Sequence, residues 1–214
     1  MYPYGSFSPY TNRTVYGWAN YSPVYSDQQM ICFSPGQLEF KKEMRTLWEQ
    51  HVAWTRMAII SLVFGLPDTA EVLARLLQNA PDMGNLIKPF YGAGVADIYA
   101  GLIKEHLVIA SELVKAAKAG DTTAAAAAEK RWYANADQIV EFLSRLNPYF
   151  PKEEFRKMFY KHLAMTKAEA VTMLQQDYKA SIKLYDQIER EALIMADILS
   201  TYLYPGSSLV NMQR

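Results

Sequence analysis

A nine-residue pattern centred on histidine occurs three times in this chain, and it constrains the fold more than any other feature. The three copies are Leu47–Thr55, Leu102–Ala110 and Met158–Thr166. Their central residues are the only histidines of the protein: His51, His106 and His162. The histidines lie about 55 residues apart, a spacing typical of a repeated helical unit. The pattern therefore predicts three copies of one structural unit.

Each histidine lies in an apolar stripe with helical spacing. Residues at positions −4, +4, +8 and +11 from a residue share its face of a helix. In the three copies these positions hold only apolar residues or threonine: Leu47, Thr55, Ile59 and Leu62; Leu102, Ala110, Val114 and Ala117; Met158, Thr166, Ala170 and Met173. Threonine or alanine one turn after each histidine leaves room beside the imidazole. We predict three helices that each present a histidine on an apolar face.

Turn residues divide the chain into helical hairpins. Glycines and prolines gather between long stretches with helical spacing, and each hairpin closes with aromatic residues and a proline. The predicted parts are an arm at 1–36, hairpins at about 37–92, 93–150 and 151–204, and a tail at 205–214. The fold class is therefore predicted as all-α, with three consecutive antiparallel hairpins forming one six-helix bundle at 37–204.

Local signals predict where individual helices begin and end. Asp68 is expected to cap the second helix, with Glu71 completing a capping box. Pro81 is expected to break that helix, because proline lacks the backbone N–H group and clashes with the preceding turn. Gly120 is expected to end the helix that carries His106.

The segment 1–36 has an unusual composition. It holds nine aromatic residues, six of them tyrosines, four prolines, and only Arg13 and Asp27 as charges. Disordered tails are normally poor in aromatic residues and rich in charge. We predict that this aromatic arm packs on protein, either on its own bundle or on a neighbouring copy. The expected partners are a second copy of the chain, in a homo-oligomer, or another protein.

The overall composition narrows the classes of function. Lys and Arg together equal Asp and Glu at 22 each, which argues against a nucleic-acid partner. The N-terminus lacks the pattern of a signal peptide, and no apolar run is long enough for a membrane span, so a cytoplasmic location is predicted. One cysteine excludes an internal disulfide framework. Phosphate-binding loops and nucleophile elbows are absent.

The three histidines are the candidate chemical site. If their helices converge, three neutral imidazoles can bind a divalent transition metal such as zinc, copper or iron. A carboxylate from a second helix is expected as the fourth ligand or as a hydrogen-bond partner of a ligand. The candidates for this role are Asp82, Asp137 and Glu189.

A second interpretation of the histidines requires no metal. Each can be a buried core residue that bonds to a polar side chain within its own hairpin, because a buried imidazole needs a hydrogen-bond partner. The expected partners are Asn79, Asn135 and Glu191. The sequence leaves both interpretations open.

Several stretches resemble an uncharacterised family of small all-helical bacterial proteins. They are Leu47–Met57, Lys104–Ala110, Leu113–Asp121, Arg131–Asp137 and His162–Thr166, and the likeness covers about residues 40–203. Some members carry the label acetylglutamate kinase. The resemblance implies a helical fold and no established activity. Amino-acid kinases need glycine-rich turns on an α/β sheet, and this chain shows no strand pattern, so kinase activity is not expected.

Two functions follow from these features. The first is a helical-bundle protein with a three-histidine metal site at His51, His106 and His162. The second is a structural or self-assembling protein whose arm contacts a neighbouring subunit. No catalytic motif is present, which favours a protein without enzymatic activity and leaves the reaction, if there is one, undefined.

Overall fold

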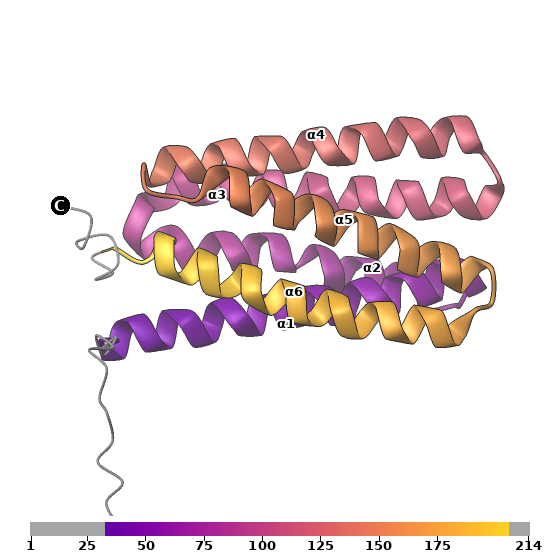
Figure 1. Ribbon diagram of the computed structural model, residues 1–214, viewed down its shortest axis with the longest axis horizontal. Coiled ribbons are helices and arrows are strands. Elements are labelled where there is room, and N and C mark those ends of the chain that lie inside the picture. The colour runs from indigo at the N-terminus through magenta and orange to yellow at the C-terminus, as the bar shows by residue number, and fades with distance from the viewer. Residues whose placement is uncertain (1–32, 206–214) are drawn as a thin grey trace, which may run out of the picture. The chain divides into compact units, whose positions relative to one another are not determined.

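A computed structural model describes residues 33–205 (Figure 1). The predicted arm up to residue 32 and the tail after residue 205 lie outside the described residues. The helices are α1 Pro35–Phe64, α2 Thr69–Leu77, α3 Asn79–Ala119, α4 Thr122–Leu146, α5 Lys152–Leu174 and α6 Tyr178–Leu203. No strand occurs in the described part of the chain, which confirms the all-α class.

The long helices lie side by side along one direction (Figure 1). The most extensive packing joins α3 to α4 and α5 to α6, and a short turn connects the helices of each pair. Helix α1 packs on α6 and α3, and α4 packs on α5. One large group of buried apolar side chains runs between these helices. The origin of the chain from three copies of one hairpin stays a prediction.

Helix α1 begins with a capping box. The Ser34 hydroxyl accepts a hydrogen bond from the Gln37 backbone, and the Gln37 side chain accepts one from the Ser34 backbone N–H group. These two bonds satisfy groups that a helix start leaves unpaired. Pro35 is the first residue of α1, so Pro35 and Gly36 belong to the helix and not to the arm in which the sequence analysis places them.

The capping box predicted at Asp68 and Glu71 is wrong. Asp68 precedes α2, but its side chain makes no capping bond. Its Oδ1 atom instead accepts a hydrogen bond of 2.9 Å from the Ser61 hydroxyl in α1. The carboxylate thus ties the start of α2 to the preceding helix. The helix end predicted at Gly120 is confirmed, because this residue is left-handed with φ 72°.

Helix α3 is interrupted at Gly92 and not at Pro81. Pro81 lies in the first turn of α3, where its missing N–H group costs nothing. Gly92 has φ 81° and ψ 169°, a conformation essentially restricted to glycine. The two parts of α3 then approach closely, since a Cβ atom at Gly84 would lie 2.8 Å from the carbonyl oxygen of Ala96. Helix α3 is therefore a kinked element.

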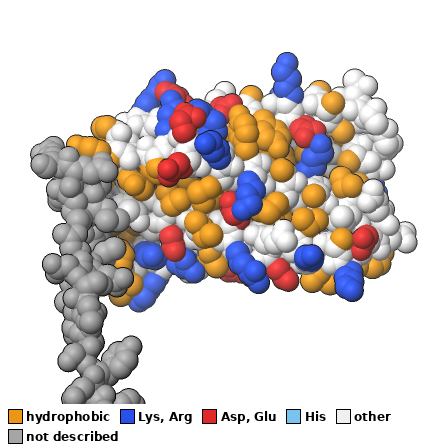
Figure 2. All heavy atoms as spheres, viewed as in Figure 1, with side chains coloured by type: hydrophobic (Ala, Val, Ile, Leu, Met, Phe, Trp, Pro, Cys, Tyr) orange, Lys and Arg blue, Asp and Glu red, His pale blue; other side chains and the backbone are white. Residues whose placement is uncertain are grey.

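No helix in the described part of the chain contains a stretch long and apolar enough to cross a membrane. The surface over the described residues mixes charged and hydrophobic side chains (Figure 2). Twelve large hydrophobic residues are at least about one-third exposed there, among them Phe64, Ile98, Tyr178, Ile182 and Ile194.

Candidate functional site

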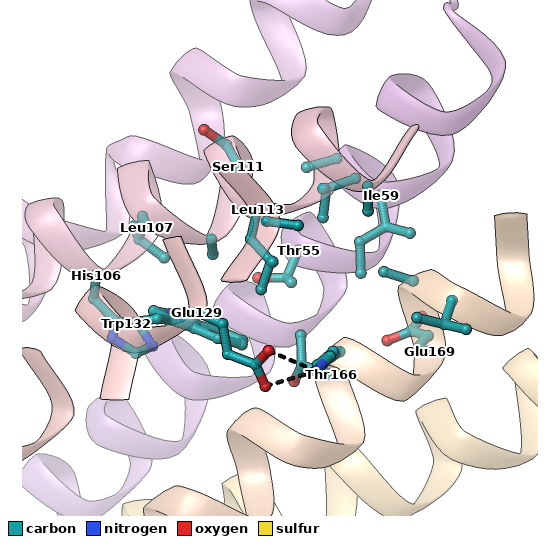
Figure 3. A pocket seen from close by; sticks show the side chains of 18 of the residues that line it. Thr55, Ile59, His106, Leu107, Ser111, Leu113, Glu129, Trp132, Thr166 and Glu169 are labelled. Atoms are coloured by element: carbon teal, nitrogen blue, oxygen red, sulfur yellow. Dashed lines mark hydrogen bonds and ion pairs between the residues drawn. The ribbon is translucent and has the colours of Figure 1, made fainter. Parts of the chain in front are cut away.

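The three histidines lie around one internal cavity. His51 comes from α1, His106 from α3 and His162 from α5, and their side chains are 7%, 4% and 3% exposed. The cavity has a volume of about 280 Å³, and most of its wall is formed by alanine, valine, leucine and isoleucine side chains. Figure 3 shows His106 and Trp132 on one side of the cavity, with Thr55, Thr166 and Glu169 further along it. The structure thus brings together the residues that the repeated pattern singles out.

The imidazole rings fall into two groups. The ring centroids of His51 and His162 are 5.9 Å apart, and Trp48 packs edge-on against both of them. The His106 ring instead packs between Trp132 at 5.3 Å and Phe159 at 5.2 Å. Aromatic side chains therefore fix the position of each imidazole at the cavity wall.

All three imidazoles are neutral at pH 7. Burial lowers the pKa of His51 to about 4 and that of His106 to about 3. It also lowers the pKa of His162 well below the ordinary value of 6.5, and the two neighbouring histidines add to this effect. A neutral imidazole offers one hydrogen-bond donor and one acceptor. The three imidazoles therefore give the cavity wall polar groups that carry no charge.

One histidine has a partner within its own helix pair. Asn135 Oδ1 lies 2.9 Å from His106 Nδ1, and Asn135 Nδ2 donates a hydrogen bond of 3.1 Å to the Leu102 carbonyl oxygen. This contact confirms the predicted pairing of His106 with Asn135.

The other two histidines lack the expected partners. Asn79 Nδ2 donates to the Leu47 carbonyl oxygen at 3.3 Å, but Asn79 Oδ1 and His51 Nδ1 are both buried without a hydrogen bond. Glu191 accepts a hydrogen bond from Lys161 in place of His162. The predicted pairing is therefore wrong at these two positions.

Buried polar atoms without a partner gather around the cavity. Four of them belong to residues that line it: His51 Nδ1, Thr55 Oγ1, Trp132 Nε1 and His162 Nδ1. A fifth, Trp48 Nε1, belongs to the ring that packs on His51 and His162. An unpaired buried donor or acceptor costs about 1–3 kcal/mol, and native proteins contain few of them. Such a concentration beside a cavity indicates a place where a bound molecule makes hydrogen bonds.

The predicted three-histidine metal centre is not found. Among residues 33–205, no group of three or more His, Cys, Asp or Glu side chains is arranged to hold a metal ion. The ring packing differs among the three histidines, because His51 and His162 pack on each other whereas His106 packs on Trp132 and Phe159.

The three carboxylates proposed as further ligands lie elsewhere. Asp82 accepts a hydrogen bond from Gln78, and Asp137 accepts one from Arg156 and one from a tyrosine of α5. Glu189 is partly buried next to a second carboxylate, which belongs to α1. None of the three lines the cavity.

The cavity wall contains a buried carboxylate, Glu169, that was not among the residues predicted from the sequence. Glu169 of α5 is 1% exposed and accepts a hydrogen bond from Arg56 of α1. Arg56 also donates to the Ser181 hydroxyl and lies 5.0 Å from the centre of the Tyr185 ring. Burial raises the pKa of Glu169 to about 7, although Arg56 acts to lower it. Glu169 follows His162 by seven residues, a helical spacing that could have placed it on the same face.

An ion pair lies at the edge of the cavity. Lys167 Nζ of α5 is 2.6 and 2.7 Å from the two carboxylate oxygens of Glu129 in α4 (Figure 3). Both side chains are partly exposed, and both line the cavity. The pair thus marks the side on which the cavity approaches solvent.

A comparison of the chain with protein-family models, with curated proteins and with solved structures found no match. The resemblance to the uncharacterised bacterial family stays a prediction. The case for a function therefore depends on the cavity itself.

Proposed function

We propose that this protein binds a small, largely apolar molecule in the cavity between α1, α3 and α5. The observation that carries the proposal is the set of unpartnered polar atoms around an apolar cavity of about 280 Å³. A cavity of about 150 Å³ is enough to bind benzene. A molecule with two fused rings is therefore a suitable size for the first probe.

The charge of the cavity favours an uncharged ligand. Its three imidazoles are neutral because burial lowers their pKa values. The ionisable side chains of its wall are already paired, because Glu169 lies against Arg56 and Lys167 lies against Glu129. A charged ligand would lose its hydration without gaining a free opposite charge. The proposal thus covers neutral apolar molecules that carry a few polar atoms.

Filling the cavity is expected to abolish binding. Ala110 lines the cavity one turn after His106, so Ala110→Phe places a ring in the space that the ligand would use. We expect 2-methylnaphthalene to raise the melting temperature of the wild-type chain and to leave that of Ala110→Phe unchanged. Ala127→Leu is the matched control, because Ala127 is exposed on α4 and does not line the cavity. Calorimetric titration measures the affinity directly.

Two outcomes would contradict the proposal. The first is the absence of a shift for the wild-type chain with 2-methylnaphthalene and with related two-ring molecules. The second is equal binding by wild type and Ala110→Phe, which would place the probe elsewhere. A zinc titration of untagged protein is a separate experiment. If zinc binds stoichiometrically and prevents binding of the probe, metal binding by the imidazoles would replace the ligand proposal.

A second candidate function is self-association through the N-terminal arm that precedes α1. Exposed apolar side chains on the described helices favour it, because Phe64 of α1 and Tyr178 of α6 are in ring contact and both are about half exposed. Ile182 and Ile194 are also exposed on α6. The arm supplies aromatic rings that can cover such side chains on a neighbouring copy.

Removal of the arm is expected to change self-association and not the helical fold. A deletion of residues 1–32 keeps the capping box of Ser34 and Gln37, so α1 can still begin at Pro35. We expect unchanged helix content by circular dichroism, and a lower mass by light scattering than the full chain shows. A truncated protein that melts without cooperativity would instead assign the arm to the core of its own domain.

A further inference from the structure

The hydrogen bonds of Asn135 decide which nitrogen of His106 carries a proton. Asn135 Nδ2 donates to the Leu102 carbonyl oxygen, so the amide oxygen is the atom that faces the imidazole. An amide oxygen only accepts hydrogen bonds. His106 Nδ1 must therefore be the donor and carry the proton.

The opposite nitrogen is then a free acceptor. A neutral imidazole has one protonated nitrogen, so a proton on Nδ1 leaves a lone pair on Nε2. No residue in the described part of the chain makes a hydrogen bond to His106 Nε2. Burial keeps the ring neutral at pH 7 by lowering its pKa to about 3. His106 lines the cavity, and its Nε2 atom is not among the buried polar atoms that lack a partner, which fits an acceptor exposed to that space.

We infer that the ligand of this cavity carries a hydroxyl group on an apolar body, and that this hydroxyl donates a hydrogen bond to His106 Nε2. The inference depends on the proposed function, since it names the class of molecule bound at the same site. Asn135 acts as a positioning residue, because it holds the imidazole in the tautomer that accepts.

The contrast with the equivalent asparagine supports this role. Asn79 donates to the Leu47 carbonyl oxygen as Asn135 donates to that of Leu102, and both asparagines are buried. Only Asn135 also bonds to an imidazole. No bond fixes the tautomers of His51 and His162, whose Nδ1 atoms are unpartnered. His106 is therefore the histidine of the cavity wall whose tautomer is fixed, so that it accepts a hydrogen bond from a ligand.

Three probes of similar shape test the inference on the full-length chain. 2-Naphthol carries the O–H donor, 2-methylnaphthalene replaces the hydroxyl with a methyl group, and 2-methoxynaphthalene keeps the oxygen but lacks the donor. We expect 2-naphthol to bind about tenfold more tightly than the other two, the gain of one buried hydrogen bond. Equal affinities for all three would overturn the inference and leave the proposed cavity function standing. No binding of any probe would overturn the proposed function itself.

Two variants distinguish the effect of Asn135 on the tautomer of His106 from the general effect of replacing a buried asparagine. Asn135→Leu is expected to remove the preference for 2-naphthol, because His106 Nδ1 loses its acceptor and the proton can move to Nε2. Asn79→Leu is the matched control and is expected to keep the preference, since it breaks the same type of backbone bond without touching an imidazole. Loss of the preference in both variants would overturn the positioning role of Asn135.

Nitrogen-15 spectra of the imidazoles decide the tautomer without a ligand. In the wild-type chain at pH 7, we expect His106 to show a protonated Nδ1 and an unprotonated Nε2. This measurement needs only folded wild-type protein, so it stands even if the leucine variants fail to fold. A protonated Nε2 would overturn the inference.

Discussion

Lowering the pH from 6.5 towards 4 is expected to destabilise the folded protein strongly. His51 and His106 are buried, with pKa values of about 4 and about 3, and His162 is also well below 6.5. In this range the unfolded chain binds protons that the folded chain does not. Above pH 6.5 the buried histidines do not lower the free energy of unfolding. Below pH 6.5 they lower it progressively as the pH falls. Each histidine adds about 1.4 kcal/mol per pH unit to the slope of the free energy of unfolding against pH.

Glu169 acts in the opposite direction. Burial raises its pKa to about 7, above the ordinary value of 4.5. Between these values the folded chain binds the proton more tightly, so this residue adds stability as the pH falls. Glu169 offsets the effect of about one histidine. The free energy of unfolding should therefore fall by a net amount of about 5 kcal/mol between pH 6.5 and 4.5. This loss is comparable with the whole free energy of unfolding of many domains.

Urea unfolding at a series of pH values checks this expectation. The free energy of unfolding should fall steadily below pH 6.5 for the wild-type chain. His51→Gln cannot titrate, so its slope should be smaller by about 1.4 kcal/mol per pH unit. A free energy of unfolding that is the same at pH 7.5 and pH 4.5 would show that the imidazoles are not buried as the structure has them.

Removing Arg56 is expected to have the second large effect. Arg56 is the cation that faces Glu169, whose side chain is almost fully buried. Well above pH 7, where Glu169 is ionised in the wild-type chain, Arg56→Met leaves the carboxylate without a partner, and breaking a buried pair in this way costs about 3–5 kcal/mol. The cost should shrink as the pH is lowered, because Glu169 then takes up a proton and becomes neutral.

Two comparisons sharpen this experiment. A double change of Arg56→Met with Glu169→Met should recover most of the stability, because it removes both charges and retains apolar volume. Arg131→Met is the matched control, since Arg131 pairs with Glu112 on the surface and both side chains are exposed. Its expected cost is below about 1 kcal/mol. Equal thermal unfolding of Arg56→Met and Arg131→Met would contradict the importance of the buried pair.

The fold class could be predicted from the sequence, whereas the gathering of the histidines depended on how their helices pack. Apolar side chains with a period of 3.6 residues define the buried face of a helix, and His51, His106 and His162 lie on such faces. Three helices of one domain that each bury such a stripe can point it at a shared interior. The periodicity alone does not decide how the helices are placed or how the rings are turned.

The details that the sequence did not predict depend on contacts between distant residues. Pro81 is a helix breaker in isolation, but in the structure it occupies the first turn of α3 and the kink forms at Gly92. Asp68 has the right position for a cap, but its carboxylate bonds to Ser61. Glu169 was overlooked because an acidic residue on an apolar face becomes meaningful only when Arg56 is seen beside it.

The kink in α3 has a consequence for how the domain opens. The kinked helix from Asn79 to Ala119 packs on α1, on α2 and on α4, and its two parts meet closely at Gly84 and Ala96. A turn between two separate helices can loosen while each partner stays in place. In α3, unfolding of either part breaks the close contact between Gly84 and Ala96, and this contact also stabilises the other part. Neighbouring regions of the protein should therefore exchange their amide hydrogens as one cooperative unit.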